Sequence, residues 1–148
     1  MANFIYNVAK AGLADGSIDW DTHTIKVLLL ESDAGENKDN ATITGLLVGS
    51  TELTSTGYAR QTLAGKAVTQ DDPNDRAELD ATDPTFTNVQ QLAAETITGF
   101  VVYRHVTNDT DSIPILHVDT ATGLPITPNG SNIAININAE GLIQLADA

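Results

Sequence analysis

Hydrophobic and polar positions alternate along most of this chain, and the pattern predicts strands rather than helices. Residues 24–30 form the strongest extended segment, with apolar side chains on both faces: Ile25, Val27 and Leu29 on one face, Leu28 and Leu30 on the other. A strand that is apolar on both faces needs cover on both faces. We therefore predict that this segment is a central strand of a sheet.

The first residues follow a helical pattern instead. Phe4 and Val8 share one face at helical spacing within residues 3–14, and Asn3 is placed to cap the start of the helix. Gly16 is a typical stop signal at the end. Two interpretations remain open at this point. The segment is either a helix that packs on a sheet of the same chain, or an arm that docks on a partner chain.

From residue 58 onward the apolar segments are short and bounded by turn residues. The longest of them is 96–106, which we expect to lie beside 24–30, and a loop over 107–112 leads to a hairpin partner at 113–118. The remaining expectations are strands at 58–63, 66–70, 76–80, 86–89, 132–138 and 142–145, helical turns at 42–48 and 90–95, and polar loops at 31–40 and 49–57.

About eight or nine short strands at regular turn spacing are typical of β-sandwiches and jelly rolls. We therefore predict a mainly β protein, β-sandwich or jelly-roll-like, with a short N-terminal helix. A chain of 148 residues suits a single domain with a substantial core. We place that single β domain over 1–148, with the N-terminal helix or arm at 1–17 and the sandwich core at 18–148.

Composition limits the classes of partner. The net charge is −13, from 7 basic and 20 acidic residues, which argues against binding to nucleic acid or to an anionic membrane. No stretch approaches the ~18 apolar residues that a membrane-spanning helix needs, and no signal peptide is recognisable, so we expect synthesis in a cytosol. The chain has no cysteine, which excludes disulfides and thiolate metal sites.

Two segments invite a metal interpretation. Asp19, Asp21 and His23 share one face if their segment is extended, although polar residues before a strand give the same pattern. The acidic residues between Asp71 and Asp83 suggest calcium, but no glycine occupies the centre of that segment and Arg76 lies within it. A solvated turn with local pairing of Arg76 explains the second segment better.

Catalytic motifs are missing from the sequence. It has no Gly-x-Ser-x-Gly elbow and no glycine-rich phosphate loop, and its other histidines, His105 and His117, flank the predicted hairpin without an obvious partner. We therefore expect a protein that is not an enzyme and has no cofactor.

Several motifs occur in order along nearly the whole chain. They are Ala2-Asn3-x-x-x-Asn7-x-Ala9-Lys10, Ile18-Asp19-Trp20-Asp21-Thr22 with Thr24-Ile25-Lys26-Val27-Leu28-Leu29, Gly57-Tyr58, Leu63-Ala64-x-Lys66-x-Val68-Thr69, Asn74-Asp75-Arg76-Ala77 with Asp80-Ala81-x-Asp83, and Ala139-Glu140-Gly141-Leu142-Ile143. Together they resemble a family of small virion structural proteins of tailed bacteriophages, the capsid decoration or cement proteins.

The resemblance implies a β-sandwich or jelly roll that binds the outer surface of the capsid. Such proteins bind the major capsid protein across neighbouring capsomers and stabilise the shell, usually as a homodimer or homotrimer. The expected location is the virion, after synthesis in the host cytoplasm, and the resemblance brings no catalytic residues. The charge of −13 fits an outer position, since the inner face of a capsid meets packed DNA.

Two elements are candidates for contact with the capsid or with another subunit. The first is the N-terminal segment Ala2, Asn3, Phe4, Ile5 and Tyr6, which is apolar enough to be buried on a neighbour. The second is the polar loop 31–40. An equally weighted alternative is that Phe4 and Ile5 complete the core of their own domain and that the loop is simply solvated.

Two other functions remain open. A tail or fibre component would use the same kind of β domain with polar loops. A carbohydrate-binding module would need exposed aromatic rings that stack on sugars. The large aromatic residues with a polar edge are scattered along the chain: Tyr6, Trp20, Tyr58 and Tyr103.

Overall fold

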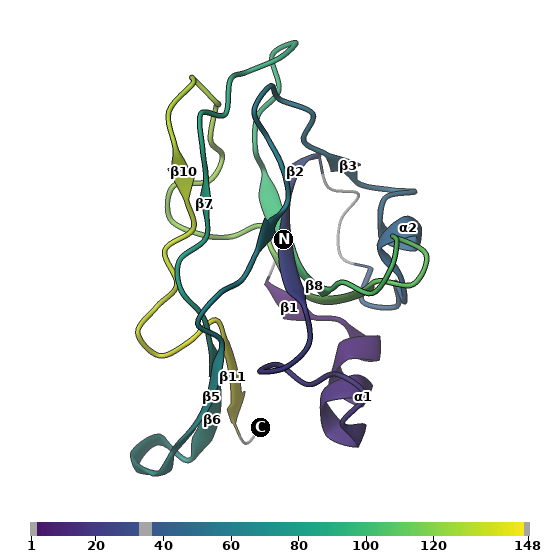
Figure 1. Cartoon of the computed structure of the whole chain (residues 1–148), viewed down its shortest axis with the longest axis vertical. Helices are drawn as coiled ribbons and strands as arrows, with labels where there is room; N and C mark the ends of the chain where they lie inside the picture. Colours follow the sequence, from purple (N-terminus) through teal and green to yellow (C-terminus); the bar gives the residue numbers. More distant parts are fainter. Residues whose placement is uncertain (1–2, 33–36, 147–148) are drawn as a thin grey trace.

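The computed structural model describes residues 3–32 and 37–146, and antiparallel sheets dominate it (Figure 1). The strands are β1 Phe4–Ile5, β2 Ile25–Ser32, β3 Thr51–Glu52, β4 Gln61–Thr62, β5 Ala67–Asp71, β6 Arg76–Asp80, β7 Thr85–Phe86, β8 Gly99–Arg104, β9 Ile113–Val118, β10 Ile133–Ala134 and β11 Ile143–Ala146. The helices are α1 Asn7–Asp15, α2 Ile43–Leu46 and the 3-10 helix η1 Asp72–Asn74. The fold is mainly β and sandwich-like with a short N-terminal helix, as predicted.

The largest sheet has the strand order β1-β9-β8-β2-β3, and β4 also pairs with β2. β2 and β8 pair over six residues, from Ile25 opposite Arg104 to Leu30 opposite Gly99. β8 and β9 form the hairpin that the sequence predicted. Pro114 lies near the start of β9, where the register shifts and its missing N–H costs least.

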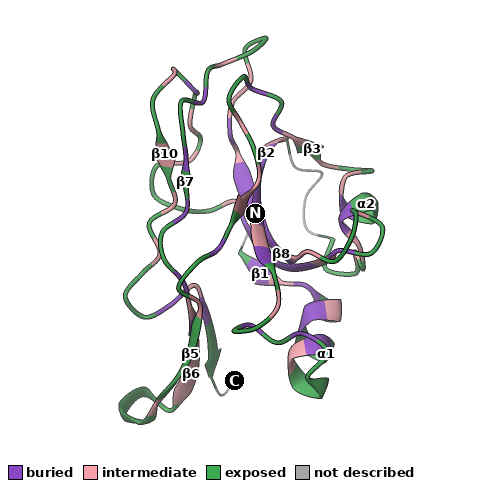
Figure 2. Cartoon of the chain, viewed as in Figure 1, coloured by how far each residue is buried: buried purple, intermediate pink, exposed green. Residues whose placement is uncertain are grey.

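β2 is buried on both faces, as its pattern predicted. Leu28 and Leu30 are fully buried on one face, and Val27 and Leu29 are 1% exposed on the other. Figure 1 shows the large sheet between α2 on one side and the small β7–β10 sheet on the other. The buried residues are concentrated in this central layer (Figure 2).

The N-terminal prediction needs correction. A helix from residue 3 is wrong, because Phe4 and Ile5 form β1 and pair with His117 and Leu116 of β9. α1 begins only at Asn7, and Tyr6 rather than Asn3 is its N-cap residue. The helix end is as predicted, since Gly16 adopts a φ of +79°. α1 packs against β9 of its own chain.

Several further assignments differ from the structure. The strand predicted at 86–89 is limited to β7, which ends at Phe86. The strand predicted at 58–63 is reduced to β4, the strand at 132–138 to β10, and the loop 49–57 contains β3. The helical turn at 90–95 does not form, because Ala93 and Ala94 both have positive φ angles. By contrast, the helical turn at 42–48 is confirmed as α2, where the Thr42 hydroxyl accepts a hydrogen bond from the Gly45 N–H at 3.1 Å.

β5, β6 and β11 form a separate three-stranded sheet, here called the β-arm, with the order β11-β6-β5. It extends from one end of the molecule (Figure 1). Leu79 and Ile143 are buried at its base, and the indole N–H of Trp20 donates to the Asp80 carbonyl at 2.8 Å. The predicted return of residues 76–80 on 66–70 is therefore confirmed.

Candidate interaction site

The predicted N-terminal contact segment packs largely within its own chain. Phe4 is 8% exposed and stacks on His117 with ring centroids 4.9 Å apart, and Tyr6 is 1% exposed. Asn3 is exposed, and its Nδ2 donates to the Thr120 carbonyl at 3.0 Å. Ile5 is half-buried. Phe4 and Tyr6 therefore have no free surface to offer a neighbour, which favours the alternative of a self-completed core, whereas Asn3 and Ile5 remain reachable.

Two predicted contact positions cannot be placed. Ala2 and the central part of the loop 31–40, residues 33–36, lie outside the described residues. Whether they contact another protein stays a prediction.

The histidines and the segment from Asp19 to His23 take part in hydrogen bonds that hold turns and strand ends. The Asp19 carboxylate accepts the backbone N–H groups of Asp21 and Thr22, and His23 Nδ1 accepts the Asp19 N–H at 3.0 Å. These residues close a turn before β2. His105 lies by Ser112 at one end of the β8–β9 hairpin, whereas His117 lies further along the ladder. Over residues 3–32 and 37–146, no cluster of three or more His, Cys, Asp or Glu side chains has metal-binding geometry.

Arg60 is the centre of a half-buried ion network. Its guanidinium donates to Glu52 through Nε at 2.7 Å and Nη2 at 2.6 Å, and to Asp109 through Nη1 at 2.6 Å and Nη2 at 2.9 Å. The pKa of Arg60 is raised mainly by its hydrogen bonds to Glu52, and the pKa of Asp109 is lowered mainly by Arg60. The phenols of Tyr58 and Tyr103 complete the network. Every charged group here is paired, so the network joins loops rather than presenting a reactive group.

A second polar cluster surrounds Glu95. Its carboxylate accepts a hydrogen bond from the Ser55 hydroxyl at 2.6 Å and from the Thr54 backbone N–H at 3.0 Å. These donors lower the pKa of Glu95 to about 2, with the Ser55 hydroxyl as the largest cause. The pKa of the neighbouring Glu31 is raised. Burial is the larger cause, and the interaction with the Glu95 carboxyl is the second.

Replacing Ser55 with alanine is expected to raise the pKa of Glu95 from about 2 toward its ordinary value of 4.5. Because the folded-state pKa is the lower one, Glu95 stabilises the fold above its unfolded pKa and loses this contribution as the pH falls toward 2. A carboxyl-detected NMR titration measures the shift. Thr56→Ala is the control, since Thr56 is exposed and meets its neighbour through the backbone. Equal pKa values in both variants would contradict the assignment.

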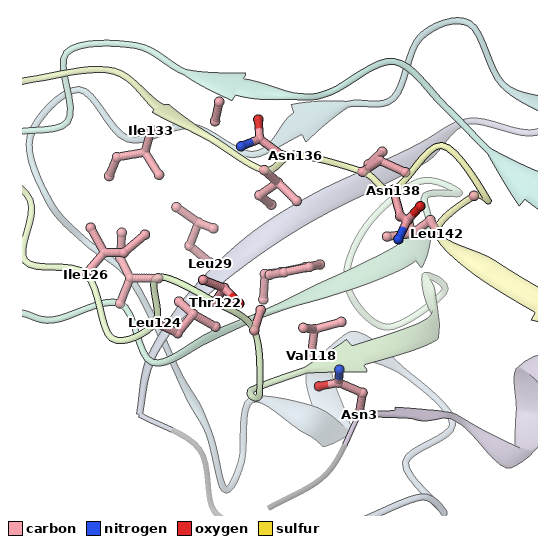
Figure 3. Close-up of a pocket in the computed structure, with 17 residues that line it drawn as sticks. Asn3, Leu29, Val118, Thr122, Leu124, Ile126, Ile133, Asn136, Asn138 and Leu142 are labelled. Carbon is pink, nitrogen blue, oxygen red and sulfur yellow. The ribbon is translucent and has the colours of Figure 1, made fainter.

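A cavity of about 300 Å³ lies between the large sheet and the segment that contains β10 (Figure 3). Its walls are mainly apolar, and its polar groups are uncharged amides and a hydroxyl. The residues labelled in the figure are Asn3, Leu29, Val118, Thr122, Leu124, Ile126, Ile133, Asn136, Asn138 and Leu142. The described lining contains no charged side chain, so the cavity is suited to an apolar group.

The β-arm carries apolar side chains on a face that its own chain leaves uncovered. Val68 and Leu145 are 48% and 43% exposed. Leu145 also lines a second cavity of about 230 Å³, whose other wall is formed by Ile5, Leu13 and Ala14. The sequence contained a signal for this surface in the alternation of Val68 with its polar neighbours, but only the ladder shows which face stays open.

The aromatic residues do not form a sugar-binding platform. Tyr6, Trp20 and Tyr103 are at most 2% exposed, and the Tyr58 hydroxyl is held by Glu52 at 2.6 Å. Stacking on a sugar ring needs an open aromatic face. These four residues therefore weigh against the carbohydrate-binding alternative.

No protein-family model, curated protein or solved structure matches this chain. Within the described part of the chain, no helix has the length and apolar character needed to cross a membrane. The class that the fold defines is a mainly β, sandwich-like protein with a projecting three-stranded arm. Its most distinctive surface is the apolar face of that arm.

Proposed function

We propose that this protein is a virion structural protein that decorates the outer surface of a tailed-phage capsid. It binds the major capsid protein across neighbouring capsomers and thereby stabilises the shell. The observation that carries the proposal is the uncovered apolar face of the β-arm around Val68 and Leu145. Exposed apolar side chains on one face of a projecting element are typical of a surface that another protein covers.

Three further features support a binding role. Arg60 and Arg76 are paired with carboxylates of their own chain, which leaves few basic groups to bind nucleic acid and favours a protein partner. The net charge of −13 suits the outer face of a DNA-filled shell. The ordered motifs along the sequence resemble decoration proteins.

The proposed mechanism requires no chemistry. A protein that binds only the assembled shell shifts the equilibrium toward that shell by mass action. Each copy contributes a modest interface, and many copies act together to resist the pressure of packed DNA.

Adding the purified protein to undecorated, expanded shells is expected to raise their melting temperature in proportion to occupancy. Differential scanning calorimetry measures this shift, and unexpanded shells serve as the control. Cryo-electron microscopy of the virion then locates the chain. Density on the tail alone, or an unchanged melting temperature at saturating protein, would overturn the proposal.

A further inference from the structure

We infer that the groove between α1 and the β-arm is the docking site for one segment of the major capsid protein. That segment presents a row of apolar side chains with lysine or arginine at one end. This inference rests on the proposed function and adds the position of the site and the chemistry of its occupant. Figure 1 shows α1 and the β-arm at the same end of the molecule.

The first wall is one face of the β-arm. In the ladder, Val68 lies opposite Leu79 and Gln70 lies opposite Ala77. On β11, Ile143 lies opposite Leu79 and Leu145 lies opposite Ala77, so each of these two cross-strand rows extends over all three strands. Cross-strand neighbours share a face, so these side chains form an uncharged surface. On this face Leu79 and Ile143 are buried, whereas Val68 and Leu145 are exposed. Most residues of β5 are exposed and most of β6 are half-buried (Figure 2).

The second wall comes from the N-terminal elements. Ile5 of β1 and Leu13 and Ala14 of α1 line a cavity of about 230 Å³ together with Leu145. Lys10 is the one charged residue in that lining. Leu145 also borders the hollow that continues along Val68 toward the tip of the β-arm. The two hollows therefore meet at Leu145, which lines both of them, and together they lead from α1 to the tip of the β-arm.

Charge identifies the occupant. The tip of the β-arm carries Asp71, Asp72 and Asp75 next to the apolar face. Arg76 does not offset all of them, since its guanidinium pairs with Asp71 at 3.0 Å and with Glu78 at 2.8 Å. Within the described residues, Asp72 and Asp75 are exposed and form no salt bridge, which leaves negative charge at this end of the groove.

A partner must complement both features. Apolar side chains fill the groove, and a basic side chain at one end meets Asp72 and Asp75. A second copy of this chain fits poorly, because each copy has a net charge of −13 and would bring carboxylates to the tip. A shell protein segment with basic residues has the complementary sign.

The test uses the full chain and a defined probe. The probe is a synthetic amphipathic helix of roughly 18 residues, with leucines on one face and lysines at one end. A second peptide has glutamates in place of the lysines. We expect the lysine peptide to shift the NMR signals of Ile5, Leu13, Val68 and Leu145, with little effect elsewhere. The glutamate peptide is expected to bind at least tenfold more weakly.

Matched variants localise the binding. Val68→Gln is expected to lower the affinity for the lysine peptide roughly tenfold, because Val68 lies on the face that lines the groove. Thr69→Gln, one position along and on the opposite face, is expected to leave binding unchanged. The double change Asp72→Asn and Asp75→Asn is expected to abolish most of the salt dependence. Near-ultraviolet circular dichroism confirms that each variant folds.

NMR shifts that avoid the groove, or equal binding of both peptides, would overturn the inference. Concentration-dependent dimerisation that Val68→Gln removes would also overturn it, because the occupant would then be a second copy. The shell experiment remains separate. Loss of groove binding with intact shell stabilisation refutes only the docking site. Groove binding without shell stabilisation refutes the decoration function and the capsid protein as occupant, and leaves only the groove's preference for apolar, basic peptides.

Discussion

Replacing Phe86 with alanine is expected to lower the free energy of unfolding by about 3–5 kcal/mol. Phe86 is fully buried, and its ring stacks on Tyr58 with centroids 5.9 Å apart. It belongs to β7, one of the two strands of the small sheet that covers the central layer. Truncation to alanine would leave a cavity between the layers of the sandwich, which a surface loop cannot fill.

Urea denaturation followed by tryptophan fluorescence measures the Phe86 effect, because the single tryptophan, Trp20, is buried. Val48→Ala is the matched control. Val48 is 86% exposed, so its truncation is expected to change stability by no more than about 0.5 kcal/mol. A loss below about 1 kcal/mol for Phe86→Ala would show that the β7–β10 layer does not pack on the sheet as described.

Replacing Arg60 with methionine is expected to lower the free energy of unfolding by about 2–3 kcal/mol near pH 7. Methionine keeps much of the side-chain volume but leaves Glu52 and Asp109 without their partner. The cost depends on pH with a definite sign. Arg60 lowers the folded-state pKa of Asp109. The stabilisation is therefore fully present above the pKa that Asp109 has in the unfolded chain, and it is lost as the pH falls through the lower folded-state pKa.

Urea denaturation at about pH 7 and again at about pH 3 tests this sign, with the difference between wild type and Arg60→Met shrinking at the lower pH. Arg104→Met is the control, since Arg104 donates one hydrogen bond to the Ser17 carbonyl at 2.9 Å. Its cost is expected to stay near 1 kcal/mol and to be independent of pH over this range. A pH-independent loss for Arg60→Met would refute the ionic origin of the effect.

The central layer could be predicted from the sequence because its signals are local. Apolar side chains on both faces identified β2, and the long apolar segment near residues 96–106 identified β8 as its neighbour. The hairpins at 107–112 and 71–75 were recognisable because turn residues separate two strand patterns. In each case the structure satisfies a preference that a few adjacent residues already express.

The N-terminus and the short strands could not be predicted in the same way. The spacing of Phe4 and Val8 fits a helix, but β9 offers Phe4 and Ile5 a free sheet edge that no local pattern reveals. β10 is shorter than the alternation of residues 132–138 implies, because the ladder ends where its partner β7 ends. Tertiary pairing overrides local propensity at these positions.

The candidate site was less predictable than the fold. The N-terminal segment was correctly recognised as apolar, but sequence alone cannot tell whether Phe4 faces its own core or a neighbour. The groove combines residues from three distant parts of the chain: Ile5 and Leu13, Val68, and Leu145. Only the assembled topology brings these residues together.

The pairing of the first strand with β9 has a consequence for how the chain folds. Tyr6 and His117, which lie in contact, are 111 positions apart in sequence. During synthesis, β1 therefore leaves the ribosome long before its partner exists, and the sheet can close only after most of the chain is made. Such distant contacts place folding on the order of milliseconds to seconds, with sheet edges exposed to other nascent chains in the meantime.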